Sequence, residues 1–224
     1  MWQVAEQDFW EKMVENRMMN ITYQIKNAVY VNLTNRCPCN CVFCIRRAGP
    51  GVYGSEPLWL DHEPTVEETI VALEKWNLDA YPEVVFCGYG EPTERLDDLL
   101  EIAKWLKTNH QGLLVRVNTN GLSDLIAGGP TAHRFKGLVD TISISLNTPD
   151  AAEYLDLCRP CFRAAAYPAM LRFAEEAKKY VPNVVMTVVG EPVTTKDKQA
   201  RCQAICDRLG VRLRIRPYEK TSRS

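Results

Sequence analysis

Four cysteines stand close together in the segment Asn32–Cys44, which reads N-L-T-N-R-C-P-C-N-C-V-F-C. Cys37, Cys41 and Cys44 have the spacing C-x3-C-x2-C, while Cys39 falls between the first two. Thiolates are soft ligands that suit iron–sulfur clusters and zinc. A metal site with an open coordination position can also bind a substrate there. The spacing therefore indicates a metal-binding loop.

Zinc and unrelated thiols are the alternatives for this loop. Structural zinc sites usually combine two C-x2-C pairs, or one such pair with paired histidines. The histidines of the chain, His62, His110 and His133, show no ligand spacing. A separate C-x2-C pair, Cys158 and Cys161, could hold a second metal or act as a thiol pair, although an incidental pair is the simpler interpretation. The pattern favours an iron–sulfur cluster.

A second motif, F-C-G-Y-G-E-P-T, occupies Phe86–Thr93 at the end of an expected strand. Glycines such as Gly88 and Gly90 let a backbone approach a ligand closely. The carboxylate of Glu91 suits an ammonium donor. The segment could also be an ordinary turn between a strand and a helix. Its place one strand–helix unit after the cysteine loop favours a ligand-binding turn.

The elements that must position both motifs alternate between strand and helix patterns. Strands are expected at Ala28–Thr34, Glu83–Cys87, Leu113–Asn118, Thr141–Leu146, Asn183–Val189 and Val211–Arg216. Helices are expected at Val4–Met18, Thr65–Asn77, Thr93–Thr108, Ser123–Gly137, Ala151–Tyr180 with a break near Pro160, and Thr195–Leu209. A capping box, Thr65 to Glu68, opens the first helix after the cysteine loop. Strand and helix in alternation predict a parallel sheet with right-handed crossovers.

Polar residues recur at the expected strand ends. Functional residues of parallel α/β barrels gather at the C-terminal ends of the strands. Ser143 and Ser145 share one face of their strand, and buried polar groups of this kind need hydrogen-bond partners. A ligand, internal water or neighbouring side chains could supply those partners. The candidates at the strand ends are Asn118, Asn120, Ser143, Ser145, Val189 and Arg216.

The two motifs together resemble those of the radical S-adenosylmethionine (SAM) superfamily, over about Ile21–Tyr218. Together with G-V-Y-G-S-E-P-L-W-L they are similar to TatD-associated radical SAM proteins, with Tyr89 where the superfamily usually has glycine. The resemblance implies an α/β fold, a partial (β/α)6 TIM-like barrel of the radical SAM core with a short N-terminal helix. It divides the chain into an N-terminal helical extension, residues 1–20, and a core domain, residues 21–224.

The resemblance also implies the composition of the site. Cys37, Cys41 and Cys44 would hold three irons of a [4Fe–4S] cluster, and the fourth iron would bind the amino and carboxylate groups of SAM. Cys39 would then be a spectator. Contacts to SAM are expected from Phe43, Gly88, Tyr89, Gly90, Glu91, Asn118, Asn120, Ser143, Ser145, Val189 and Arg216.

The implied activity is the reductive cleavage of SAM to methionine and a 5′-deoxyadenosyl radical. That radical would abstract a hydrogen atom from an unknown substrate, and an external donor such as flavodoxin or ferredoxin would supply the electron. A glycyl-radical-enzyme activase is one alternative. An RNA-modifying methylase is another, with Cys158 and Cys161 as weak candidates for its catalytic cysteines. A zinc or iron–sulfur binding module is the alternative that is not an enzyme.

Composition narrows the class of partner. The 224 residues carry a net charge of −1, so a general affinity for nucleic-acid phosphates is not indicated. No apolar run approaches the roughly 20 residues of a membrane span, and the cysteines, with no visible secretory signal, indicate a reducing cytoplasm. Only the N-terminal helix and the loop Ile45–Pro64 are available to cover an open barrel. We therefore expect a macromolecular substrate or partner at the opening.

Overall fold

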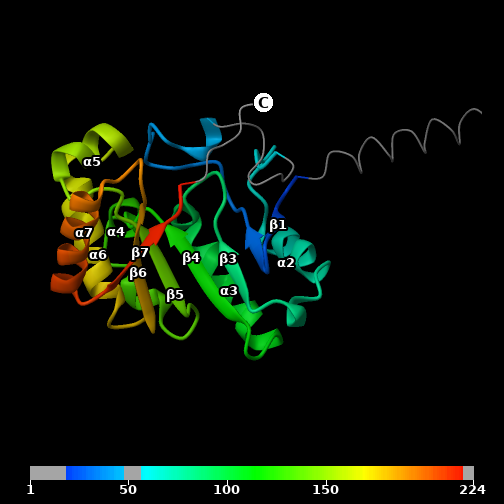
Figure 1. Cartoon of the computed structure of the whole chain (residues 1–224). Helices are drawn as coiled ribbons and strands as arrows, with labels where there is room; N and C mark the ends of the chain where they lie inside the picture. The colour runs from blue at the N-terminus through cyan, green and yellow to red at the C-terminus, as the bar shows by residue number, and fades with distance from the viewer. Residues whose placement is uncertain (1–18, 48–56, 219–224) are drawn as a thin grey trace, which may run out of the picture.

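Residues 19–47 and 57–218 are described in a computed structural model of the chain (Figure 1). They form one sheet with the strand order β1-β2-β3-β4-β5-β6-β7. β1 pairs antiparallel with β2, and every later pair is parallel. The strands are β1 Thr22–Ile25, β2 Ala28–Val31, β3 Glu83–Phe86, β4 Leu114–Thr119, β5 Thr141–Ser145, β6 Asn183–Val189 and β7 Arg212–Arg216.

Helices connect the parallel strands and flank the sheet (Figure 1). The α-helices are α2 Val66–Glu74, α3 Leu96–Asn109, α4 Ser123–Ala127, α5 Ala151–Cys158, α6 Ala166–Ala177 and α7 Lys196–Leu209. Short 3-10 helices are η1 Ile45–Arg47, η2 Leu78–Ala80, η3 Pro92–Arg95, η4 Ala132–Phe135 and η5 Arg163–Ala165. The parallel strands β2 to β7 and their helices form the partial TIM-like barrel, so the predicted fold class is confirmed.

The strand β1 is an addition that the sequence pattern does not predict. It forms a hairpin with β2, in which Lys26 has a φ of 54°. The carbonyl oxygen of Lys26 accepts a hydrogen bond from Gln24 Nε2 at 2.7 Å. Glycine in the turn is the usual sequence signal for a tight hairpin. The turn between β1 and β2 has no glycine, so the sequence gives no sign of this hairpin. The hairpin also covers one edge of the parallel sheet.

Two of the expected helices are interrupted. The segment Ser123–Gly137 contains α4 and η4, and α4 ends where Gly128 adopts a left-handed φ of 71°. The segment Ala151–Tyr180 contains α5 and α6, which are separated where Arg159 has a φ of 46° directly before Pro160. The expected break near Pro160 is therefore confirmed, whereas the expected continuous helix after Ser123 is wrong because glycine ends it.

The predicted capping box at the start of α2 is confirmed. Thr65 Oγ1 accepts a hydrogen bond from the Glu68 amide at 3.1 Å, and Glu68 Oε2 accepts one from the Thr65 amide at 2.8 Å. These bonds satisfy two amide groups that have no partner inside the helix. A cap of this kind is worth about 1 kcal/mol, so the start of α2 is fixed locally.

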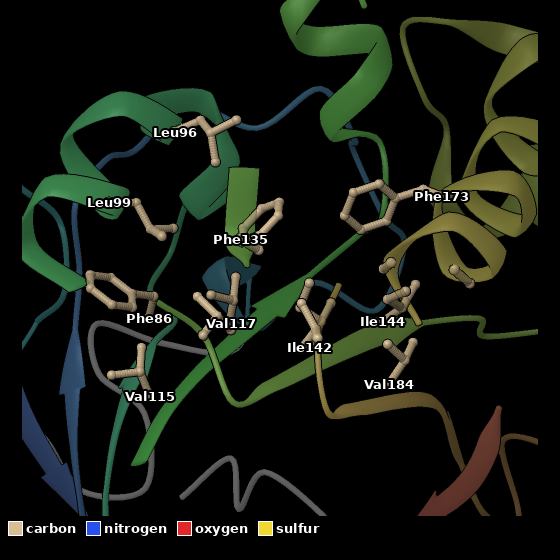
Figure 2. Close-up of a cluster of buried hydrophobic side chains, with 14 of the residues drawn as sticks. Phe86, Leu96, Leu99, Val115, Val117, Phe135, Ile142, Ile144, Phe173 and Val184 are labelled. Atoms are coloured by element: carbon tan, nitrogen blue, oxygen red, sulfur yellow. The ribbon is translucent and has the colours of Figure 1, made fainter. Parts of the chain in front are cut away.

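A continuous apolar core lies between the sheet and the helices (Figure 2). Val115 and Val117 of β4 and Ile142 and Ile144 of β5 are fully buried, and Phe173 of α6 packs in the same cluster. Each buried side chain of this size stabilises the fold by about 1.5–3 kcal/mol. This layer holds the strands in register and so fixes the positions of their ends.

The other face of the sheet carries different side chains. Successive residues of a strand point to opposite faces, so the residues between the core positions face the inside of the partial barrel. On β4 these are Arg116 and Asn118, and on β5 they are Ser143 and Ser145. On these two strands the inner face is therefore polar where the outer face is apolar.

Some predicted features lie outside the described residues. They are the helix at Val4–Met18 and the central part, residues 48–56, of the loop Ile45–Pro64. The division of the chain at residues 1–20 and 21–224 stays a prediction. Within residues 19–47 and 57–218, no helix is both long and apolar enough to cross a membrane.

Candidate functional site

The cysteine loop leaves the C-terminal end of β2 and is held against the end of α5. The Asn40 amide donates a hydrogen bond to the Cys158 carbonyl at 3.0 Å. In the opposite direction, the Cys161 amide donates to the Pro38 carbonyl at 2.8 Å. The C-x2-C pair, for which an incidental role is the simpler interpretation of the sequence, therefore supports the loop through its backbone.

Burial separates Cys39 from the other cysteines of the loop. Cys37, Cys41 and Cys44 are half-buried, whereas Cys39 is buried and belongs to the apolar core. The partly exposed sulfurs are the ones with the spacing C-x3-C-x2-C. This arrangement agrees with a spectator role for Cys39 and ligand roles for the other cysteines, which stay predictions.

Neighbouring thiols shift the acidity of two of these cysteines. A hydrogen bond from Cys158, followed by one from Cys39, lowers the pKa of Cys41 to about 4. A hydrogen bond from Cys39 likewise lowers the pKa of Cys37. The same contacts raise the pKa of Cys39 and Cys158, which stay protonated as donors. The thiolate is the form that binds metal, and the ligand roles of Cys37 and Cys41 stay predictions.

Arg46 brings positive charge and an aromatic contact to the loop. Its Nε donates a hydrogen bond to Cys44 Sγ at 3.3 Å, and its guanidinium carbon lies 6.0 Å from the centre of the Trp59 ring. The Trp59 ring in turn meets Tyr89 edge to face, with 5.1 Å between the centroids. Arg46, Trp59 and Tyr89 therefore connect the cysteine loop to the second motif.

The donor set fits an iron–sulfur cluster. Among residues 19–47 and 57–218, no three His, Cys, Asp or Glu side chains are grouped so that they could hold one metal ion. A cluster differs from a single ion because its irons stand apart, so the thiolates that hold it need not meet at one point. Three partly exposed sulfurs on one tight loop, beside a guanidinium group, meet that requirement.

The G-Y-G-E-P turn follows β3 and packs against the chain that leads into the cysteine loop. A Cβ atom on Gly88 would stand 1.9 Å from Asn32 Oδ1, and one on Gly90 would stand 2.2 Å from the Thr34 carbonyl oxygen. The amide of Tyr89 donates to Asn32 Oδ1 at 3.3 Å. Both glycines are therefore needed for the close approach of two chain segments, and their contact with SAM stays a prediction.

The carboxylate of Glu91 is buried and bonded within the chain. Its Oε1 accepts hydrogen bonds from Thr93 Oγ1 at 2.8 Å and Thr119 Oγ1 at 2.7 Å, and its Oε2 accepts one from the Asn120 amide at 2.7 Å. Burial raises the pKa of Glu91, although these bonds oppose the shift. The carboxylate thus joins the ends of β3 and β4, and its contact with an ammonium group stays a prediction.

The end of β4 brings two predicted site residues near the cysteines. Asn120 Nδ2 lies 4.0 Å from Cys37 Sγ and 3.9 Å from Cys39 Sγ. Asn118 Oδ1 is buried, and no hydrogen-bond donor of the described residues reaches it. Since buried polar atoms nearly always have a partner, this oxygen marks a place for a donor from outside the described residues.

The remaining predicted residues divide into two groups. Phe43 and Val189 line the same small cavity of about 60 Å³, so the structure brings them together. Ser143 accepts a hydrogen bond from Arg214 at 3.1 Å, which is the side-chain partner considered as an alternative to a ligand. Ser145 is half-buried on the inner face, and Arg216 is exposed at the end of β7.

Sequence reasoning assigned no supporting role to Asn147. Its Nδ2 donates a hydrogen bond to Cys158 Sγ at 3.2 Å, and its φ is 64°. Asparagine tolerates this left-handed conformation better than most residues. The only sequence signal for this role is the position of Asn147 directly after an expected strand. That position does not predict its partner Cys158, which follows eleven residues later.

A model of the radical SAM superfamily matches residues 31–201 of the chain, a range that includes both motifs. No curated protein matches the sequence. The narrower resemblance to TatD-associated proteins stays a prediction.

Solved structures of radical SAM proteins share the fold. A radical SAM methyltransferase from Sphaerobacter thermophilus has a TM-score of 0.56 at 15% identity, over 91% of this chain and 70% of that one. The protein anSMEcpe with bound AdoMet has a TM-score of 0.56 at 16% identity, over 84% and 50%. The FeFe-hydrogenase maturase HydG from Carboxydothermus hydrogenoformans has a TM-score of 0.60 at 16% identity, over 93% and 48%. The chain spans about half the length of the last two, and such identities show the fold alone.

Proposed function

The chain belongs to the radical SAM superfamily, whose members are enzymes that use a [4Fe–4S] cluster and SAM, and we propose that Cys37, Cys41 and Cys44 hold its cluster. When bound, the cluster and SAM supply reductive carbon–sulfur cleavage and hydrogen-atom abstraction, which the protein directs but does not perform itself. One observation carries the proposal: the chain that leads into the C-x3-C-x2-C loop packs against the G-Y-G-E-P turn at the C-terminal ends of β2 and β3.

The surroundings of the loop support a cluster in this place. Cys158 donates to Cys41, and Arg46 donates to Cys44. Hydrogen bonds and positive charge next to ligand sulfurs stabilise a negatively charged cluster and tune its reduction potential. The backbone bonds from the end of α5 hold the loop in place.

For SAM we propose a position along the ends of β3 to β6. The backbone of Gly88–Gly90 and the carboxylate of Glu91, whose Oε2 accepts one hydrogen bond from the Asn120 amide, would accept hydrogen bonds from its amino group. Asn118 Oδ1 is a buried acceptor without a partner among the described residues. Phe43 and Val189 provide apolar surface for the adenine ring beside one small cavity. We also propose the remaining contacts to SAM that the sequence predicts, which are those of Tyr89, Asn120, Ser143, Ser145 and Arg216.

The partners follow from the chemistry. Reductive cleavage needs an external one-electron donor, and we propose one of the flavodoxin or ferredoxin type. All nine cysteines are free thiols, which supports a reducing compartment such as the cytoplasm. A macromolecular substrate or partner at the barrel opening stays a prediction.

The placement of Cys158 bears on the alternative of an RNA methylase. That activity would need catalytic cysteines with access to substrate. Cys158 is buried at 1% exposure and is bonded to Asn147 and Cys41, whereas Cys161 is exposed. A buried thiol that donates to a proposed cluster ligand is better suited to support the cluster than to accept a methyl group.

The test is the cleavage of SAM by the reconstituted enzyme. Anaerobic protein loaded with iron and sulfide, then reduced with dithionite, should release 5′-deoxyadenosine and methionine, measured by liquid chromatography. Cys41→Ala should reduce the release to background. Cys202→Ala, which removes a buried thiol of α7, should leave the release intact. Reduced, iron-loaded wild-type protein that leaves SAM unchanged would contradict the proposal.

A further inference from the structure

The cysteine loop docks on the last turn of α5, and this contact brackets Cys41. The last carbonyl groups of an α-helix have no amide partner within the helix. In α5 the Leu157 carbonyl accepts a hydrogen bond from the Val42 amide at 2.9 Å. The Cys158 carbonyl accepts one from the Asn40 amide at 3.0 Å. Since Asn40 and Val42 are its neighbours in the chain, Cys41 is fixed beside the end of α5 from both sides.

The side chain of Cys158 lies within this contact. It is 1% exposed and belongs to the apolar core, against which Cys41 packs. Its thiol donates a hydrogen bond to the Cys41 sulfur. At this degree of burial a water molecule cannot take the place of the thiol. The chain itself therefore supplies the donor for this side of the Cys41 sulfur.

Asn147 fixes the direction of that thiol. Its Nδ2 donates a hydrogen bond to Cys158 Sγ at 3.2 Å. The backbone amide of Asn147 donates to the Thr187 carbonyl of β6 at 3.3 Å, which holds the residue at the end of β5. The NH2 group of an asparagine side chain has donors only, so the thiol hydrogen of Cys158 is left for Cys41. The two bonds form a relay from Asn147 through Cys158 to Cys41, in which each bond polarises the next.

We infer that Cys158 is a positioning residue of the cluster, whose thiol, oriented by Asn147, holds the sulfur of Cys41 and raises the reduction potential of the cluster. The inference rests on the proposed function, in which Cys41 is a cluster ligand. Hydrogen bonds to ligand sulfurs are among the factors that set the potential of a cluster. They favour the reduced state, because it carries the additional negative charge. The relay would thus make the cluster easier for an external one-electron donor to reduce.

The experiment is a redox titration of the anaerobically reconstituted protein without SAM, followed by electron paramagnetic resonance of the reduced cluster. At the potential where half of the wild-type cluster is reduced, Cys158→Ala should lower the ratio of reduced to oxidised cluster at least about threefold, since one hydrogen bond is lost. Cys158→Ser retains a donor and should stay within about twofold of wild type. Cys202→Ala is the matched control, because it removes an equally buried thiol from α7 and should leave the ratio unchanged.

Asn147→Gly tests the relay separately from the thiol. Glycine adopts the left-handed φ of 64° at this position without strain, so the variant removes the amide and keeps the backbone. It should shift the ratio in the same direction as Cys158→Ala. In the double variant Asn147→Gly should have no further effect, because the thiol through which it acts is then gone.

Several results would overturn the inference. They are a wild-type potential in Cys158→Ala, a potential of Cys158→Ser as low as that of Cys158→Ala, and additive shifts of Asn147→Gly and Cys158→Ala. If Cys158→Ala fails to hold a cluster, Asn147→Gly decides, and an unchanged potential there would refute the relay. Loss of iron from both Cys158 variants, with full iron in Cys41→Ala, would make Cys158 a ligand instead.

Failure of the proposed function gives a different result. Wild-type protein that holds no cluster after reconstitution would contradict the proposed function and this inference together. A wild-type cluster that cleaves SAM, with a potential that does not respond to Cys158→Ala, would contradict the inference alone. Thermal unfolding of the variants before reconstitution shows whether they fold, so a change in potential is distinguishable from a loss of structure.

Discussion

At the scale of single residues, Glu91 shows what sequence reasoning can and cannot predict. Its place in the G-Y-G-E-P motif predicts a contact with SAM. Its partners are two threonine side chains and two backbone amides of the chain itself, and those of Thr119 and Asn120 lie 28 and 29 positions away. A motif predicts a residue's importance, but only the folded chain shows which lone pairs are already used.

The first prediction concerns this carboxylate. Glu91→Ala should destabilise the protein by about 3 kcal/mol, because buried donors on Thr93, Thr119 and Asn120 would lose their acceptor. Glu91→Gln retains the shape and should cost less. Unfolding in urea measures the free energies.

A neighbour in the same turn provides the control. Glu94 makes only a distant ion pair, 3.8 Å from Arg36, so Glu94→Ala should cost less than about 1 kcal/mol. Equal losses for Glu91→Ala and Glu94→Ala would show that the buried network does not hold the ends of β3 and β4 together.

At the scale of elements, the site depends on two loops that share one interface. The cysteine loop and the G-Y-G-E-P turn were each predicted from local motifs, and alternation of strand and helix predicted that they would meet at one end of the sheet. The contact of α5 with the cysteine loop was not predictable. This contact consists of backbone hydrogen bonds between segments more than a hundred residues apart. Backbone hydrogen bonds do not require particular side chains, so the sequence does not indicate them.

The second prediction tests that interface. Gly88→Ala should destabilise the protein by about 1–3 kcal/mol and lower its iron content after reconstitution, because the new Cβ would stand 1.9 Å from Asn32 Oδ1. Gly129→Ala is the matched control, since a Cβ there meets no heavy atom within 4 Å, and its effect should stay within about 0.5 kcal/mol. Thermal unfolding and iron analysis measure both effects. Similar melting temperatures for the two variants would refute the packing role of Gly88.

At the scale of the whole molecule, the two faces of the sheet carry different kinds of side chain. The outer face packs the apolar core against the helices (Figure 2), and the inner face carries polar residues on β4 and β5. Six parallel strands were predictable because their apolar runs and helix signals alternate regularly. The hairpin strand β1 was not, since it arises from pairing at the edge of the sheet rather than from a local pattern.

The central claim is that three particular thiols hold the cluster, and iron content with visible absorbance after anaerobic reconstitution tests it most directly. Single alanine substitutions of Cys37, Cys41 and Cys44 should each remove the brown chromophore and most of the iron. Cys39→Ala should keep both, because its sulfur is buried in the core. Loss of the cluster in Cys39→Ala, together with its retention in Cys41→Ala, would contradict the account.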